Sequence, residues 1–236
     1  MPDTNRLGLP LVVPAQSQKH VTVNESFVRL DALVQLTLIS EGAQTPPGTP
    51  GEGEVHSVGA GATGDWLGED GRLAVFVNGG WAFVTPGVGW QGWSEAAGSR
   101  VSFDGAGWEP GAGSFSPNGA GFVHRTVEVD HAIGAGATST VTDLLPEGSI
   151  VYGVTARVLS PIGGPASIEI GVVGSSNRYG SGIGTTTGAW ARGITGSPLT
   201  YYAATDVILG AEGGTFDGTG VLRIVVHVAE LTLPRL

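Results

Sequence analysis

Residues 221–228 read VLRIVVHV, and this stretch decides the class of fold. Apolar side chains take every second position, with Arg223, Val225 and His227 between them. A period of two sends alternate side chains to opposite faces of an extended chain, which is typical of a β-strand with one face in a core. The sequence therefore predicts a long strand here, with the even-numbered side chains buried.

The stretch IVYGVTARV at residues 150–158 shows the same alternation. Ile150, Tyr152 and Val154 are expected on its buried face, whereas Thr155 and Arg157 are expected on the opposite face. The candidate strands of this region are 122–130, 150–159, 167–173, 201–209 and 221–233. Gly-rich connections without a helical period separate them, so residues 122–236 are expected to form an antiparallel β-sandwich of the jelly-roll type.

The composition agrees with a mainly β protein and excludes several functional classes. Of the 236 residues, 41 are glycine and 14 % are charged, while a hydrophobic content of 41 % argues against disorder. The 11 basic and 21 acidic residues give a net charge of −10, so no nucleic-acid partner is expected, because phosphate binding needs clustered Lys and Arg. No apolar run has the length of a membrane helix, and no signal-peptide pattern is present, so no membrane insertion is expected. The lack of cysteine excludes disulfides, thiolate catalysis and cysteine-based zinc sites.

A short amphipathic helix is expected near the N-terminus. Asn24 can cap a helix that begins at Glu25. Its apolar stripe has spacings of three and four residues and consists of Phe27, Leu30, Val34 and Leu38. A helix of about fourteen residues is marginal alone, so the stripe is expected either to dock on the β region or to form a seam between the subunits of an oligomer.

A small Trp-rich β segment follows the helix. Five of the six tryptophans lie between residues 66 and 108. Asn78-Gly79 and Asp104-Gly105 predict two hairpin turns, each followed by a strand that begins near a tryptophan. The tryptophans either fill the core of a small sheet or form a platform for stacking sugars. Residues 111–121 are rich in Gly, Ser and Pro and are expected to link a domain at 1–110 to the sandwich at 122–236.

No catalytic site is expected from the motifs. The chain has no Gly-x-Ser-x-Gly nucleophile elbow, and its five histidines are far apart in the sequence. We therefore predict a protein that is not an enzyme and holds no metal or cofactor. Acidic residues are numerous enough to supply a glycosidase carboxylate pair, so a polysaccharide-cleaving glycoside hydrolase is the enzymatic alternative.

A sugar-binding site is predicted in the C-terminal domain. Two Gly-rich stretches at 174–182 and 185–193 are expected to be loops that carry rings beside amide and guanidinium groups. Rings can cover the apolar face of a sugar, while polar side chains pair with its hydroxyls. The candidate residues are Asn177, Arg178, Tyr179, Trp190, Arg192, Tyr201, Tyr202 and Asp206. In the alternative interpretation, Trp190 and one tyrosine belong to the core and Arg178 only solvates a loop.

Four stretches resemble a known family of uncharacterised-domain proteins from alphaproteobacterial phages and gene transfer agents. They are LPL at 9–11, PAQSQKHVTVNE at 14–25, LDALV at 30–34 and ATGDW at 62–66. The resemblance covers roughly residues 5–110. Residues 151–158 also resemble C-terminal β modules of other proteins from these particles.

The resemblance implies a virion structural component, most like the head-spike fibre of a gene transfer agent. Such a fibre is made in the bacterial cytoplasm without a signal peptide and sits on the outside of a phage-like particle. Its N-terminal segment is expected to attach to a capsid or spike-base protein, and its C-terminal domain to adhere to host capsular polysaccharide. A homo-oligomer is expected, a trimer ahead of a pentamer. The alternatives are a capsule depolymerase and a capsid decoration protein without a ligand.

Overall fold

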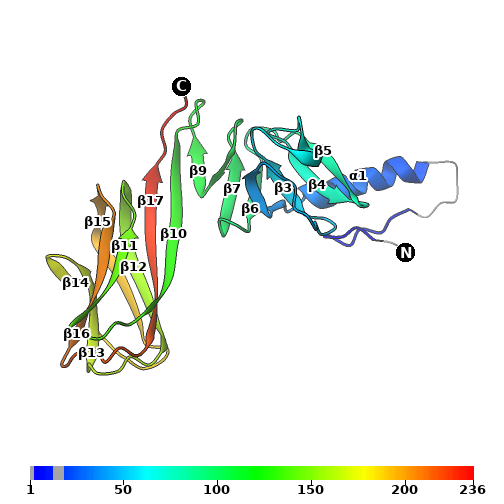
Figure 1. Cartoon of the computed structure of the whole chain (residues 1–236). Helices are drawn as coiled ribbons and strands as arrows, with labels where there is room; N and C mark the ends of the chain where they lie inside the picture. The colour runs from blue at the N-terminus through cyan, green and yellow to red at the C-terminus, as the bar shows by residue number, and fades with distance from the viewer. Residues whose placement is uncertain (1–2, 13–18) are drawn as a thin grey trace. The chain divides into compact units, whose positions relative to one another are not determined.

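The computed structural model describes residues 3–12 and 19–236 and confirms a mainly β protein with one short N-terminal helix (Figure 1). The chain divides into two compact units, Met1–Phe115 and Ser116–Leu236. Residues 14–18 of the PAQSQKHVTVNE stretch lie outside the described residues. In the part of the chain that is described, no helix combines the length and apolar character needed to span a membrane.

The first unit holds the helix and two small sheets with strand orders β2-β3-β4-β5 and β1-β6-β7-β8. Strand β1 runs parallel to β6 and β2 parallel to β3, and the other pairs of these two sheets are antiparallel. The elements are α1 (Lys19–Leu33), β1 (Thr37–Leu38), β2 (Ser40–Ala43), β3 (Val55–Val58), the 3₁₀ turn η1 (Gly64–Trp66), β4 (Leu73–Val77), β5 (Gly80–Val84), β6 (Gln91–Ser94), β7 (Ser99–Phe103), β8 (Trp108–Pro110) and β9 (Ala112–Phe115). Strand β9 lies inside the stretch 111–121 that the sequence predicts to be a linker.

The start of α1 differs from the prediction because Asn24 does not cap it. The helix begins at Lys19, and the Asn24 side chain bonds both backbone groups of Val12: its Oδ1 accepts from the Val12 N–H at 2.9 Å and its Nδ2 donates to the Val12 carbonyl at 3.1 Å. A short Asn side chain can form hydrogen bonds with backbone groups of a neighbouring segment as readily as with those of a helix end. Asn24 therefore ties the N-terminal segment to the side of the helix, where Figure 1 shows the segment running beside α1.

Asp31 holds the same segment further along the helix. Its carboxylate is buried and accepts hydrogen bonds from the Thr4 hydroxyl at 2.7 Å, the Arg6 N–H at 2.8 Å and the Leu7 N–H at 2.6 Å. The Arg6 guanidinium in turn donates to carbonyls at the C-terminal end of the helix. These charge-assisted bonds satisfy a buried carboxylate that would otherwise destabilise the unit.

The end of α1 corrects the predicted stripe. The helix stops at Leu33, and Gln35 takes a positive φ of 55°, a left-handed conformation that ends helices. Leu38 therefore lies in β1 and is fully buried in the core of the first unit, so it belongs to no helix stripe.

Both predicted hairpins are present in the first unit. Asn78 and Gly79 have φ values of 52° and 74°, as the two central residues of a tight hairpin require, and they join β4 to β5. At the second hairpin, Asp104 Oδ1 accepts from the N–H groups of Ala106 and Gly107 in a longer loop between β7 and β8. The tryptophans divide between the two interpretations of the sequence. Three of them are buried or half-buried, namely Trp66, Trp81 and Trp108, and two are exposed, namely Trp90 and Trp93.

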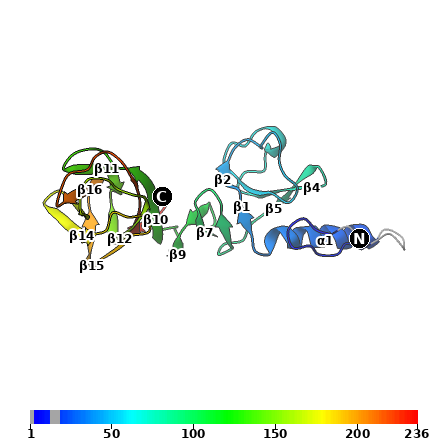
Figure 2. The ribbon, with the colours of Figure 1, turned by 90° about the horizontal axis from the view of Figure 1, so that it is seen from below.

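The second unit is a jelly roll of eight antiparallel strands. Within it the sheets have the orders β15-β12-β17-β10 and β11-β16-β13-β14, so the first strand pairs with the last, the second with the seventh and the third with the sixth. The strands are β10 (Gly121–Ala132), β11 (Thr138–Leu145), β12 (Ser149–Ser160), β13 (Ser167–Val172), β14 (Ser175–Ile183), β15 (Trp190–Tyr201), β16 (Thr205–Glu212) and β17 (Val221–Leu231). Figure 2 shows the strands nearly end-on, with β11 and β16 across the core from β12 and β15.

The core of the jelly roll lies between the two sheets, as the alternation in β17 predicts. Leu222, Ile224 and Val226 are fully buried in it. In β12 the predicted alternation fails at Ile150 and Tyr152, where Val151 is buried in their place, because the pairing shifts register between Val151 and Gly153. Such a bulge turns the following side chains over, so Tyr152 is exposed although Val154 is buried.

Candidate functional site

The outer face of the β15-β12-β17-β10 sheet gathers arginines and one exposed tryptophan. Strand register places Trp190 of β15 opposite Arg157 of β12, Arg157 opposite Arg223 of β17, and Arg223 opposite Asp130 of β10. Side chains directly opposite each other on neighbouring strands lie about 5 Å apart at Cβ. One row across the sheet therefore runs from an aromatic ring through two guanidinium groups to a carboxylate.

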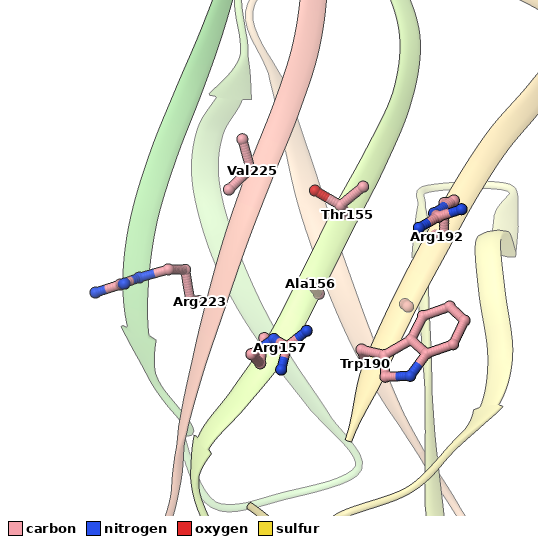
Figure 3. Close-up of a pocket in the computed structure, with 8 residues that line it drawn as sticks. Thr155, Ala156, Arg157, Trp190, Arg192, Arg223 and Val225 are labelled. Carbon is pink, nitrogen blue, oxygen red and sulfur yellow. The ribbon is translucent and has the colours of Figure 1, made fainter. Parts of the chain in front are cut away.

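A second row lies next to the first on the same face. It consists of Arg192, Thr155, Val225 and Glu128, one residue from each strand. The residues of the two rows on β15, β12 and β17 line a shallow depression of about 590 Å³, which we call the outer-face site (Figure 3). Its lining residues are Thr155, Ala156, Arg157, Trp190, Ala191, Arg192, Arg223 and Val225.

Trp190 is the aromatic group of the outer-face site. Its side chain is 61 % exposed, and the Arg192 guanidinium carbon lies 5.8 Å from the ring centroid, within the range of a cation–π contact. An indole held at the surface beside a cation can stack on the apolar face of a ring-shaped ligand, while the guanidinium donates hydrogen bonds.

Arg223 is neutralised within the sheet. Its Nε and Nη2 donate to the two carboxylate oxygens of Asp130 at 2.6 and 2.7 Å, and Nε lies 3.5 Å from Glu128. The hydrogen bonds from Arg223 lower the pKa of Asp130 below its usual value, and the same pair raises the pKa of Arg223. The guanidinium groups of Arg157 and Arg192, by contrast, form no hydrogen bond or ion pair with the described residues, although the Arg192 guanidinium contacts the Trp190 ring.

The eight sugar-binding residues predicted from the sequence do not form one site. Of the two stretches expected to be loops, 174–182 is almost wholly strand β14, whereas 185–193 is a turn at 185–189 followed by the start of β15. Both strands lie at the edge of their sheets. Trp190 and Arg192 lie in the outer-face site. Asn177 and Arg178 lie on β14 in the other sheet, and Arg178 is half-buried there.

Tyr179 is a core residue and cannot stack on a ligand. It is 1 % exposed and packs among the buried residues of the jelly roll, and its hydroxyl lies 2.8 Å from the hydroxyl of Tyr201. The alternative interpretation, in which one tyrosine is core, therefore holds for Tyr179. It fails for Trp190, which is exposed.

The remaining candidates lie away from Trp190. Tyr201 ends the twelve-residue strand that Trp190 begins, and Tyr202 is exposed just beyond it. Asp206 lies on β16 of the other sheet, where its Oδ1 accepts a hydrogen bond from the Asp143 N–H.

The sequence reasoning missed Thr155, Arg157, Arg223 and Val225 as site residues. It did place Thr155 and Arg157 opposite the buried face of one strand, and Arg223 and Val225 between the buried residues of another. The sequence does indicate that each of two alternating strands carries an arginine on its outward face. Only the pairing of β12 with β17, which are far apart in the sequence, shows that these two arginines are neighbours.

The predicted oligomer residues have different environments. Leu30 and Val34 are 50 % and 45 % exposed, Phe27 is half-buried, and Val23 is exposed one turn earlier. Leu38, as described above, is buried. Among residues 3–12 and 19–236, no group of three His, Asp or Glu side chains is arranged as metal ligands.

Comparison with known proteins gives a family match and structural similarities, of which one is described here. Residues 23–109 match the family model described as "Protein of unknown function (DUF2793)", which supports the predicted resemblance over this part of the chain. No curated protein matches the chain. Among solved structures, the chain is similar to a chain of the "Cyanophage Pam1 capsid asymmetric unit", with a TM-score of 0.35 and 23 % identity, covering 50 % of this chain and 91 % of that one.

Proposed function

We propose that this protein is an adhesin on the outside of a phage-like gene transfer particle. The first unit attaches it to a capsid or spike-base protein, and the second unit binds host capsular polysaccharide. It acts by binding and not by catalysis. The resemblance of residues 5–110 to proteins of phages and gene transfer agents supports the particle, and the family match at 23–109 overlaps that region.

The outer-face site supports the polysaccharide ligand. The observation that carries the proposal is an exposed tryptophan set among arginines on an open sheet face, where a long chain can lie without entering a deep cavity. Extended polymers need such open surfaces, whereas small molecules are usually enclosed in pockets. Recognition then comes from stacking on Trp190 and from hydrogen bonds donated by Arg157 and Arg192.

The proposal is tested by binding of purified host capsular polysaccharide to the full-length protein. Stacking on an aromatic ring contributes about 1–3 kcal/mol for nucleic-acid bases, so Trp190→Ala is expected to weaken binding at least about fivefold. Trp93→Ala is the matched control, because Trp93 is also half-exposed but lies in the first unit. Equal binding by the parent and the Trp190 variant would show that the polysaccharide does not bind at the outer-face site.

The same incubation separates the adhesin from its alternatives. The chain length of the polysaccharide is followed by size-exclusion chromatography during exposure to the protein. Unchanged length with retained binding supports the adhesin. Progressive shortening would identify a depolymerase, and the absence of any binding would favour a decoration protein without a ligand.

A further inference from the structure

The outer-face site has an uneven distribution of charge. Glu128 and Asp130 lie on β10, the strand next to β17, and both face Arg223. The half formed by β12 and β15 carries Arg157 and Arg192 without a carboxylate partner among the described residues. A chain with a net charge of −10 thus presents a local cationic surface beside its exposed Trp190.

The position of Arg157 opposite Arg223 destabilises the sheet. Arg157 and Arg223 are direct cross-strand neighbours, and like charges in opposite positions destabilise a sheet. Asp130 offsets the charge of Arg223 through two short hydrogen bonds. Nothing in the described part of the second unit does the same for Arg157, although a Thr or Gln would fit an exposed strand position equally well.

An anionic ligand would supply the missing partner. A guanidinium group binds a carboxylate, sulfate or phosphate through two parallel N–H···O bonds, which makes arginine suited to recognising such groups. Figure 3 shows Arg157, Trp190 and Arg192 on the neighbouring strands β12 and β15, while the Arg223 side chain extends toward β10. The two unpaired guanidinium groups are therefore the ones next to the ring.

We infer that the outer-face site recognises an anionic sugar residue, whose ring stacks on Trp190 and whose acidic group binds Arg157 and Arg192. This inference rests on the proposed function and names the class of polysaccharide. The overall negative charge repels polyanions at long range, but electrostatic interactions are screened beyond about 8 Å at physiological ionic strength. The local arginines can therefore select an acidic sugar at contact without attracting nucleic acid.

The test combines a change in the protein with a change in the polysaccharide. The full-length parent, Arg157→Gln and Arg29→Gln are titrated with host capsular polysaccharide in three forms: native, carboxyl-reduced and desulfated. Arg29→Gln is the control, because it removes the same charge from an exposed position on α1. Thermal melting of each variant confirms that the exposed substitutions leave the fold intact.

Arg157→Gln is expected to weaken binding of the native polysaccharide about tenfold, and Arg29→Gln to leave it unchanged. Removing the acidic group from the sugar should weaken binding by the parent similarly, and should remove the difference between the parent and Arg157→Gln, because the two changes delete the same contact. Whether reduction or desulfation has this effect identifies the anion as a carboxylate or a sulfate.

The outcomes distinguish the inference from the proposed function. Strong binding by the parent that is unaffected by both chemical treatments would overturn the inference and leave the polysaccharide adhesin standing. Additive effects of Arg157→Gln and of anion removal would also overturn it, because the two groups would then not be in contact. No binding to any form would contradict the proposed function itself.

Discussion

Tyr179 and Trp190 show at the scale of single residues how packing and recognition differ. Both are aromatic residues in a Gly-rich stretch of sequence, yet one is 1 % exposed and the other 61 %. Truncation of a large buried ring costs about 3–5 kcal/mol, whereas exposed substitutions usually change stability by less than about 0.5 kcal/mol. We therefore expect Tyr179→Ala to lower the free energy of unfolding strongly and Trp190→Ala to leave it nearly unchanged, as measured by urea denaturation. Equal destabilisation by both would contradict the assignment of Trp190 to the surface.

The Tyr179 hydroxyl also makes the stability of the jelly roll depend on pH in the alkaline range. Burial, followed by the hydrogen bond to Tyr201, raises the pKa of Tyr179 above its ordinary value of about 10. A group whose pKa is higher in the folded state contributes stability that is complete below the unfolded pKa and is lost as the pH rises above it. The parent is therefore expected to lose stability from about pH 10 upward.

Tyr179→Phe removes this titration. The variant should lose about 1 kcal/mol near neutral pH through the missing hydrogen bond, but its stability should fall less than that of the parent between about pH 8 and about pH 11. Urea denaturation at both pH values measures the difference. An identical fall in the parent and the variant would show that other groups govern alkaline unfolding.

At the scale of elements, an apolar stripe follows α1 through Val23, Phe27 and Leu30 and continues to Val34, one residue past the end of the helix. Their spacings of four, three and four residues match the repeat of a coiled-coil seam. The N-terminal segment covers the neighbouring side of the helix through Asn24 and Asp31, and it leaves Val23, Leu30 and Val34 exposed and Phe27 half-buried. The spacing favours further copies of the same helix as the partner.

A double substitution tests this seam. The parent is expected to be an oligomer, with a trimer ahead of a pentamer, and Leu30→Gln/Val34→Gln to shift it toward the monomer, because both side chains lose their apolar contact with a partner helix. Multi-angle light scattering at micromolar concentration measures the mass. A monomeric parent would contradict the seam and leave α1 with a role inside the first unit alone.

The elements that the sequence predicts well are those buried on one face. Strands β12 and β17 lie inside their sheet, and their apolar alternation, interrupted in β12 by the bulge at Tyr152, predicts their position. Strands β14 and β15 lie at sheet edges and are rich in Gly, Ser and Thr, so their sequences resemble those of loops. Gly193 illustrates the reason: a side chain there would collide with the Tyr179 carbonyl, so β15 needs a glycine where a strand usually carries a larger residue.

The candidate site was harder to predict than the fold. Trp190 and Arg192 are close in sequence and were recognised together, but Arg157 and Arg223 come from strands separated by more than sixty residues. These side chains lie side by side because β12 pairs with both β15 and β17. Such long-range pairing cannot be read from a local sequence pattern. Period-two alternation could show only that each arginine points away from the core.

At the scale of the whole molecule, the two compact units predict modular folding. Each has its own buried cluster: one contains Leu38 and Trp108, and the other contains Leu145 and Ile224. Residues 116–236 expressed alone are expected to fold and to bind capsular polysaccharide with the affinity per site of the full chain. Circular dichroism and calorimetric titration measure both properties. An unfolded spectrum would contradict the division into independent units.

Polysaccharide is predicted to bind the outer face of the jelly roll and not the Trp-rich first unit. Trp190 is the sole tryptophan of the second unit, so the indole N–H signals in a nitrogen–proton NMR spectrum report the two units separately. Titration of the full-length protein with capsule oligosaccharides, with Trp190 assigned from a Trp190→Phe variant, is the most direct measurement. The Trp190 signal is predicted to move progressively while the signals of Trp90 and Trp93 stay in place. Movement of the Trp90 or Trp93 signal with a stationary Trp190 signal would contradict the claim and place the ligand on the first unit.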